Sequence, residues 1–121
     1  MIDFQQQVSI FFMQIEYRTK QLKQCAEDKR TAIKVLGAEL AKQYLRRITS
    51  ITNARSFESL RTEPGKFHEL SGDRLGQWSA SLNANYRLII TPKEEPLTDE
   101  SGRIDWGQSS EAVIVEITDY H

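Results

Sequence analysis

The sequence contains very little cysteine and histidine. Its 121 residues include a single Cys, Cys25, and two His, which provides neither a disulfide framework nor an evident metal-ligand set. No apolar run is longer than Ile10–Met13, far short of the ~20 residues that span a bilayer. The first residues also lack the basic stretch of a signal peptide. These absences favour a cytoplasmic protein of one domain, with no cofactor expected.

Charge is nearly balanced overall but unevenly distributed. The formal net charge is −1, which alone argues against a nucleic-acid-binding protein. Residues 13–91, however, contain 14 Lys or Arg against 8 Asp or Glu, whereas residues 92–121 contain 2 against 8. The first segment could present a basic face to a phosphate-rich partner. Ordinary solvated helix faces are the commoner cause of such a pattern.

In the first half of the chain, the spacing of apolar residues is typical of one strand followed by helices. Aromatic and β-branched residues predict a strand over 9–17. Apolar residues at helical spacing predict helices over 19–36 and 38–52, with Gly37 ending the first. Ser56 is a good N-cap for a short third helix that ends at Arg61.

In the second half of the chain, apolar and polar residues alternate as they do in β-strands. We expect strands over 67–70, 78–82, 86–90 and 112–118, joined by a turn at 71–74, a hairpin loop at 83–85 and an acidic loop at 92–111. The loop is unusually long for a compact domain and could be mobile or contact a partner. The predicted fold class is α+β, with an N-terminal strand and two to three helices packed on a small antiparallel sheet.

Several chemically active side chains could meet at one edge of this sheet. They are His68, Arg74, Arg87, Asp119, Tyr120 and His121. Such a set suits RNA cleavage by the RNA's own 2′-hydroxyl, which needs a base, an acid and cations beside the phosphate. Each residue taken alone also has a structural explanation. Trp78, for example, could be a core residue or a platform on which a base stacks.

The segment "FHELSGDRLGQWSASLNANYRLII", followed after the acidic loop by "VIVEITDYH", resembles the HigB branch of the RelE/ParE toxin superfamily. The upstream segments "GAELAKQYLRRI" and "ARSFESLRTEPG" are similar to members described as plasmid-maintenance killer proteins. The resemblance covers residues 13–121 as one toxin domain, and residues 1–12 look like an N-terminal extension. It implies a RelE-like fold.

The resemblance also implies a function and its partners. Such toxins cut translated mRNA in the A site of the 30S ribosomal subunit, and a HigA-like helix-turn-helix antitoxin blocks them and represses their operon through operator DNA. By position, the catalytic residues would be His68, Arg87, Asp119, Tyr120 and His121. The RNA-binding residues would be Lys66, Arg74 and Trp78.

One departure from the family pattern keeps two other functions open. Ser71 stands where many members have a catalytic Lys, and losing such a cation could cost on the order of 10²–10³ in rate. Lys66 or Arg74 could compensate for it. The alternatives are a catalytically weak toxin paralogue acting mainly through its antitoxin, and a non-enzymatic ParE-like inhibitor of DNA gyrase.

The last residue, His121, leads to a first prediction. An α-carboxylate is anionic at pH 7 and favours the protonated form of an adjacent imidazole, which suits an acid for the leaving oxygen. We expect removal of His121, or a short C-terminal tag, to abolish the new mRNA 5′ ends that primer extension detects in a reconstituted translation reaction. An N-terminal tag should leave them in place, and equal cleavage by both tagged forms would contradict the role of His121.

Overall fold

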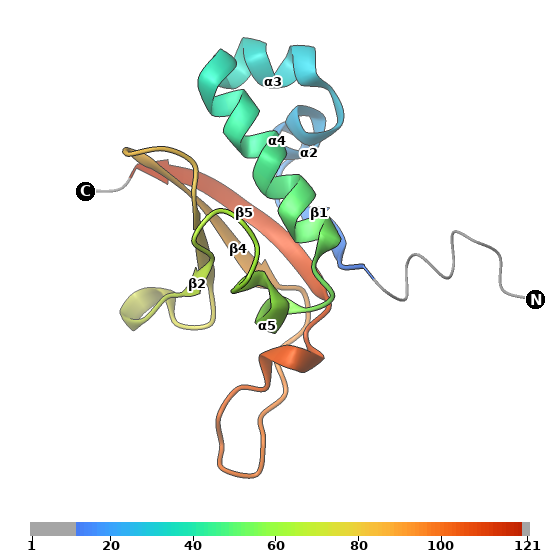
Figure 1. Cartoon of the computed structure of the whole chain (residues 1–121), viewed down its shortest axis with the longest axis vertical. Coiled ribbons are helices and arrows are strands. Elements are labelled where there is room, and N and C mark those ends of the chain that lie inside the picture. The colour runs from blue at the N-terminus through green and yellow to red at the C-terminus, as the bar shows by residue number, and fades with distance from the viewer. Residues whose placement is uncertain (1–11, 120–121) are drawn as a thin grey trace, which may run out of the picture.

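The structure is a computed structural model that describes residues 12–119 (Figure 1). Of the predicted extension 1–12, only Phe12 is among the described residues. Tyr120 and His121 also lie outside them. Most of the helical residues gather at one end of a twisted sheet, and a long loop projects from the other end. Among residues 12–119, no helix has both the length and the apolar character needed to cross a membrane.

In the described part of the chain, the sheet has five strands in the order β1-β5-β4-β3-β2. These strands are β1 (Gln14–Tyr17), β2 (His68–Glu69), β3 (Trp78–Ser81), β4 (Tyr86–Pro92) and β5 (Glu111–Asp119). Strands β2 to β5 pair antiparallel, as expected, while β1 joins the edge of β5 in parallel. The helices and the other three strands lie between β1 and β5 in the sequence. This long connection lets β1 and β5 run parallel.

Residues 12–119 form four α-helices, where three helices were predicted. They are α2 (Lys20–Glu27), α3 (Lys29–Leu36), α4 (Ala38–Asn53) and α5 (Phe57–Leu60). The single helix predicted over 19–36 is wrong, because Asp28 has extended backbone angles and its carboxylate caps α3 by accepting from the Arg30 N–H at 3.0 Å. Gly37 is confirmed as the end of this segment, with φ of 85°.

The predictions for α4 and α5 are confirmed. Tyr44 of α4 is fully buried and its hydroxyl donates to the Leu22 carbonyl at 2.7 Å, which ties α4 to α2. Ser56 caps α5 and exchanges hydrogen bonds with Ser59. In α3 the buried residue is Ala32, whereas the larger Ile33 beside it is 40% exposed.

The central strands alternate between two environments. Trp78, Ala80, Leu88 and Ile90 belong to the core that the helices cover, together with Ile114. On the other side of β3, however, Ser79 is only 3% exposed, so this strand is buried over most of its length.

Strand β5 contains a β-bulge. Ile89 pairs with Glu116 while Ile90 pairs with Ile114, which leaves Val115 as the extra residue on β5. Bulges bend a strand and raise its local twist, so the second half of β5 is turned relative to the first.

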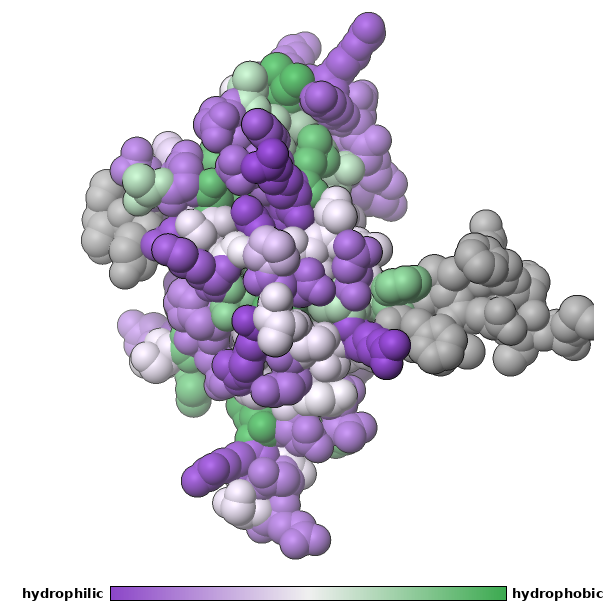
Figure 2. Space-filling model, in the orientation of Figure 1, coloured by the Kyte–Doolittle hydropathy of each residue, from purple (hydrophilic) through white to green (hydrophobic). Residues whose placement is uncertain are grey.

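The acidic loop 92–111 is anchored in the core by a tryptophan. Trp106 is 4% exposed, and its ring centroid lies 5.6 Å from that of Phe57 and 5.2 Å from that of Trp78. Farther out, an isolated bridge joins Thr98 to Ile104. Asp99 closes the tip by accepting from Ser101 and Arg103, hydrogen bonds that lower the pKa of its carboxyl. The loop is an ordered projection whose far end is hydrophilic (Figure 2).

The anchoring role of Trp106 can be tested by stability. Replacing a buried Trp with Ala leaves a cavity and typically costs about 3–5 kcal/mol, so Trp106→Ala should lower the free energy of unfolding by that amount. Urea titration followed by circular dichroism measures the change. Leu97→Ala in the same loop removes a side chain that is 63% exposed, and its effect should stay within about 0.5 kcal/mol. Equal effects of the two substitutions would rule out the anchor.

Candidate functional site

The face of the sheet turned away from the helices carries the polar side chains. Because directly paired residues lie on the same face of a sheet, the register places one row across β2 to β5 and a second row beside it. The first row is His68, Ser79, Ile89 and Glu116, and the second is Ser81, Arg87 and Thr118. We call this surface the outer face. It unites two of the predicted catalytic residues, His68 and Arg87, whose Cα atoms lie about 12 Å apart by strand geometry.

His68 lies at the exposed edge of the outer face, on β2. Its Nδ1 is 2.8 Å from the carbonyl oxygen of Lys66, and a carbonyl can only accept, so Nδ1 carries the proton in this contact. In the neutral imidazole the lone pair is then on Nε2. Lys66 has φ of 57°, a left-handed conformation imposed by the tight turn after Pro64 and Gly65, and its own side chain is exposed.

Arg87 is held by the hairpin between β3 and β4. Its Nη1 donates to the Ser81 hydroxyl at 2.8 Å and to the Asn83 carbonyl at 3.3 Å. The Asn83 side chain in turn accepts from the backbone N–H groups of Asn85 and Tyr86, both at 2.8 Å, which fixes the loop. The guanidinium is half-buried and points along a defined direction on the outer face.

Arg74 reaches the outer face from the loop between β2 and β3. Its Nη2 is 2.6 Å from Glu116 Oε1, and its Nη1 donates to Gln77 at 3.0 Å. Glu116 belongs to β5, beyond β3 and β4 in the sheet, so the loop folds back across the outer face. Sequence reasoning missed Glu116. Its signal was a lone carboxylate within the otherwise apolar run from Val113 to Ile117.

Asp119 does not join this group, which corrects its predicted place beside Arg87. It pairs with Tyr86, whereas Arg87 pairs with the preceding residue, Thr118. Because successive side chains alternate between faces, Asp119 lies on the side of Tyr86 and the helices. Tyr120 and His121, predicted to belong to the same site, lie outside the described residues.

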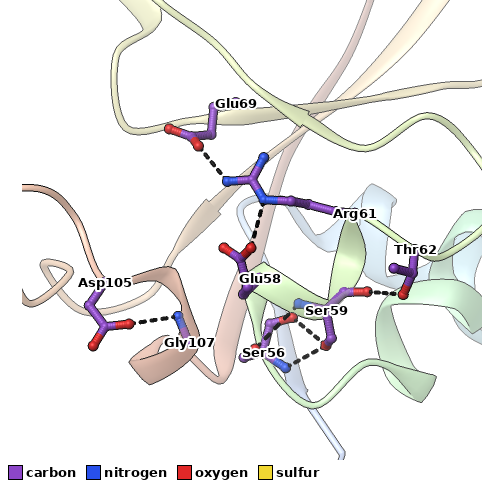
Figure 3. A network of polar contacts seen from close by, with 8 residues as sticks. All are labelled: Ser56, Glu58, Ser59, Arg61, Thr62, Glu69, Asp105 and Gly107. Atoms are coloured by element: carbon purple, nitrogen blue, oxygen red, sulfur yellow. Dashed lines mark hydrogen bonds and ion pairs between the residues drawn. The ribbon is translucent and has the colours of Figure 1, made fainter.

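Trp78 cannot be a stacking platform for RNA, which corrects another prediction. Its side chain is fully buried between the rings of Phe57 and Trp106. The Arg61 guanidinium lies 4.7 Å from the Trp78 ring centroid. As Figure 3 shows, the same guanidinium also binds Glu58 and Glu69.

The outer face thus combines one imidazole, two guanidiniums and one carboxylate. The imidazole has a ring nitrogen that can accept a proton, and the guanidiniums offer forked donors that match phosphate oxygens. Within residues 12–119, no three His, Cys, Asp or Glu side chains are grouped closely enough to hold a metal ion. The described groups provide a base and cationic donors.

Comparison with known proteins identifies the fold. No protein-family model matches the chain, and no curated protein does. Among solved structures, the chain is similar to a YoeB/ParE toxin from Agrobacterium tumefaciens, with a TM-score of 0.56 and 14% identical residues. The match covers 90% of this chain and 100% of the toxin. The chain therefore has the α+β fold of the RelE/ParE toxins, which confirms the predicted fold class.

The pair between Arg74 and Glu116 yields a prediction about stability. Its side chains are 43% and 42% exposed, and exposed ion pairs contribute about 0.2–1 kcal/mol. A double-mutant cycle with Arg74→Ala and Glu116→Gln should give a coupling energy in that range from urea unfolding. The coupling should fall in high salt. A coupling above about 2 kcal/mol would mean that the pair is part of the fold and not a contact available to a ligand.

Proposed function

We propose that this chain is the toxin of a type II toxin–antitoxin system, a HigB-like endoribonuclease that cleaves translated mRNA in the ribosomal A site. The observation that carries the proposal is the placement of His68, Arg87 and Arg74 on one face of the sheet. The sequence motif and the similarity in fold to a YoeB/ParE toxin support it. Neither similarity assigns an activity without the side chains of the site.

In this proposal His68 is the base. Its Nδ1–H donates to the Lys66 carbonyl, so Nε2 is the nitrogen that accepts the proton of the mRNA 2′-hydroxyl. The 2′-oxygen attacks the adjacent phosphorus, the bond to the 5′-oxygen breaks, and a 2′,3′-cyclic phosphate and a new 5′-hydroxyl form. The 5′-oxygen needs a proton as it leaves. We assign this proton to His121, from the resemblance, with Tyr120 beside it.

Arg87 is the group that stabilises charge in the transition state. The attack places an additional negative charge on the phosphate oxygens, and a guanidinium fixed by Ser81 and Asn83 meets that charge with little reorganisation. Arg74 and the exposed Lys66 border the same face and would contact the flanking phosphates. Asp119 has no part in this mechanism, because it lies on the other side of the strand.

The proposed partners follow from the same reasoning. The net positive charge of residues 13–91 would meet ribosomal RNA, so binding should weaken steeply with salt. A HigA-like helix-turn-helix antitoxin would block the toxin. In the toxin–antitoxin complex, the antitoxin would be the subunit that binds operator DNA.

A second candidate function is a catalytically weak toxin paralogue that acts mainly through its antitoxin. Ser71 favours this candidate, since it is exposed at the start of the 3-10 turn Gly72–Arg74, where a lysine would add a cation. The Arg74 guanidinium that could compensate is engaged by Glu116. Such a paralogue would bind the antitoxin but would not arrest growth when expressed alone.

The decisive experiment is cleavage mapping by primer extension in a reconstituted translation reaction. We expect His68→Ala to lower the cleavage rate by about 10²–10⁴, since a general base contributes that much. Arg87→Ala should lower it by about 10²–10³. Arg103→Ala removes an exposed cation from the acidic loop, outside the basic segment 13–91 and away from the outer face, and serves as the matched control with an unchanged rate.

Three other outcomes would redirect the proposal. Wild-type protein that arrests translation without cutting mRNA would exclude the nuclease. Failure of DNA supercoiling before translation would favour the ParE-like gyrase inhibitor instead. Full activity of His68→Ala would be compatible with a nuclease but would exclude His68 as its general base.

A further inference from the structure

A groove lies next to the outer face, on the far side of Arg74. It has a volume of about 790 Å³ and is lined by residues 73–77 of the loop before β3 and by residues 91–96, where β4 passes into the acidic loop. Arg74 belongs to both surfaces, because it lines the groove and also reaches Glu116 on the outer face. The groove exists only because the acidic loop supplies one of its walls.

The position of the groove suits a polymer that crosses the outer face. Thr91, at the groove, lies four residues along β4 from Arg87, and even spacing puts both side chains on the same side of the sheet. Four residues of extended strand span about 13 Å. An RNA strand whose cleaved phosphate lies at Arg87 would therefore place a nearby nucleotide at the groove.

The charges of the lining disfavour a phosphate. Asp73, Glu94 and Glu95 contribute three carboxylates, against the cations of Arg74 and Lys93. The Lys93 ammonium is directed to carboxylates outside the groove, lying 2.8 Å from Glu16 Oε1 and 3.7 Å from Glu111 Oε2. The groove thus presents an excess of hydrogen-bond acceptors.

The same lining fits a nucleobase. Pro96 provides apolar surface for the face of a ring, and Leu75, which is 74% exposed, stands at the opposite wall. Carboxylates accept hydrogen bonds from exocyclic amino groups, as on cytosine N4 or adenine N6, whereas uracil has a carbonyl oxygen at the equivalent position. Single-stranded RNA is commonly read in this way, on the edges of unstacked bases.

We propose that this groove is a base-reading subsite for the mRNA. It takes the base of a nucleotide next to the cleaved bond and selects adenine or cytosine over uracil through Glu94 and Glu95. This assignment rests on the nuclease function proposed above. It makes the acidic loop the element that sets the sequence preference of cleavage.

The test compares a set of messages in the reconstituted translation reaction. The messages differ only in the bases at the two nucleotides on each side of the cleaved bond, and primer extension measures the cleavage rate of each. Wild-type protein should prefer adenine or cytosine over uracil by about tenfold at one of these positions, the lower part of the range for a good base contact. The double variant Glu94→Gln, Glu95→Gln should bring this ratio close to one, because an amide both donates and accepts.

The matched control is Glu100→Gln, in the same loop but outside the groove, which should keep the wild-type preference. Both variants change exposed side chains, so thermal unfolding should be unaltered and misfolding is excluded as a cause. Cleavage with the same preference in the double variant and in wild type would overturn the subsite alone. An equal loss at every message would assign the groove to docking on the ribosome and also overturn it. No cleavage by any form would overturn the nuclease, and the subsite with it.

Discussion

The packing of Trp78 against Phe57 and Trp106 is the interaction on which the rest of the structure depends. These three rings come from β3, α5 and the acidic loop, segments far apart in the sequence. Edge-to-face pairs add about 0.5–1.5 kcal/mol each beyond the burial of their area. Strand β3 is thereby fixed against the helices, and the two ends of the acidic loop are held near the sheet. Both the hydroxyl that orients Arg87 and one wall of the groove depend on these positions.

On the outer face, strand register decides which polar groups lie next to one another. His68, Ile89 and Glu116 are brought into one row because each pairs in turn with its neighbour across the sheet. On this face, the ion pair of Arg74 with Glu116 joins two segments that lie far apart in the sequence. Such a surface is rigid in its backbone while its exposed side chains can exchange partners when a polyanion binds.

Much of the fold could be predicted because its signals are local. The helical period over 38–52, the Ser56 cap and the alternation over 86–90 each depend on neighbours within a few residues, and each element formed as expected. The break at Asp28 was missed because a carboxylate outside the apolar stripe of a predicted helix is compatible with both a solvated helix position and a cap. Local sequence could not decide between them.

The site was predicted less well because it depends on pairing between distant strands. The sequence indicates that His68, Arg87 and Asp119 belong to strands, but only the register decides which side chains share a face. Asp119 was misplaced for this reason, and Glu116 was overlooked until Arg74 was found beside it. Trp78 was misassigned because an aromatic residue at alternating spacing suits either face of a sheet.

The bulge in β5 also has a consequence for how the strand tolerates changes in length. Ala112 and Ile114 face the core at even spacing, but the next core contact comes three residues later, at Ile117. The extra residue, Val115, shifts the alternation of side chains by one position. Both halves of the strand can therefore bury their apolar side chains. Deleting Val115 would leave Glu116 outside and Ile117 in the core, because the strand would then alternate regularly. Keeping Val115 without forming the bulge would exchange inside and outside for everything that follows it, bringing Glu116 into the core and Ile117 to the surface. The amino-acid composition of β5 would then be the same, but its polar and apolar side chains would lie on the wrong faces of the sheet.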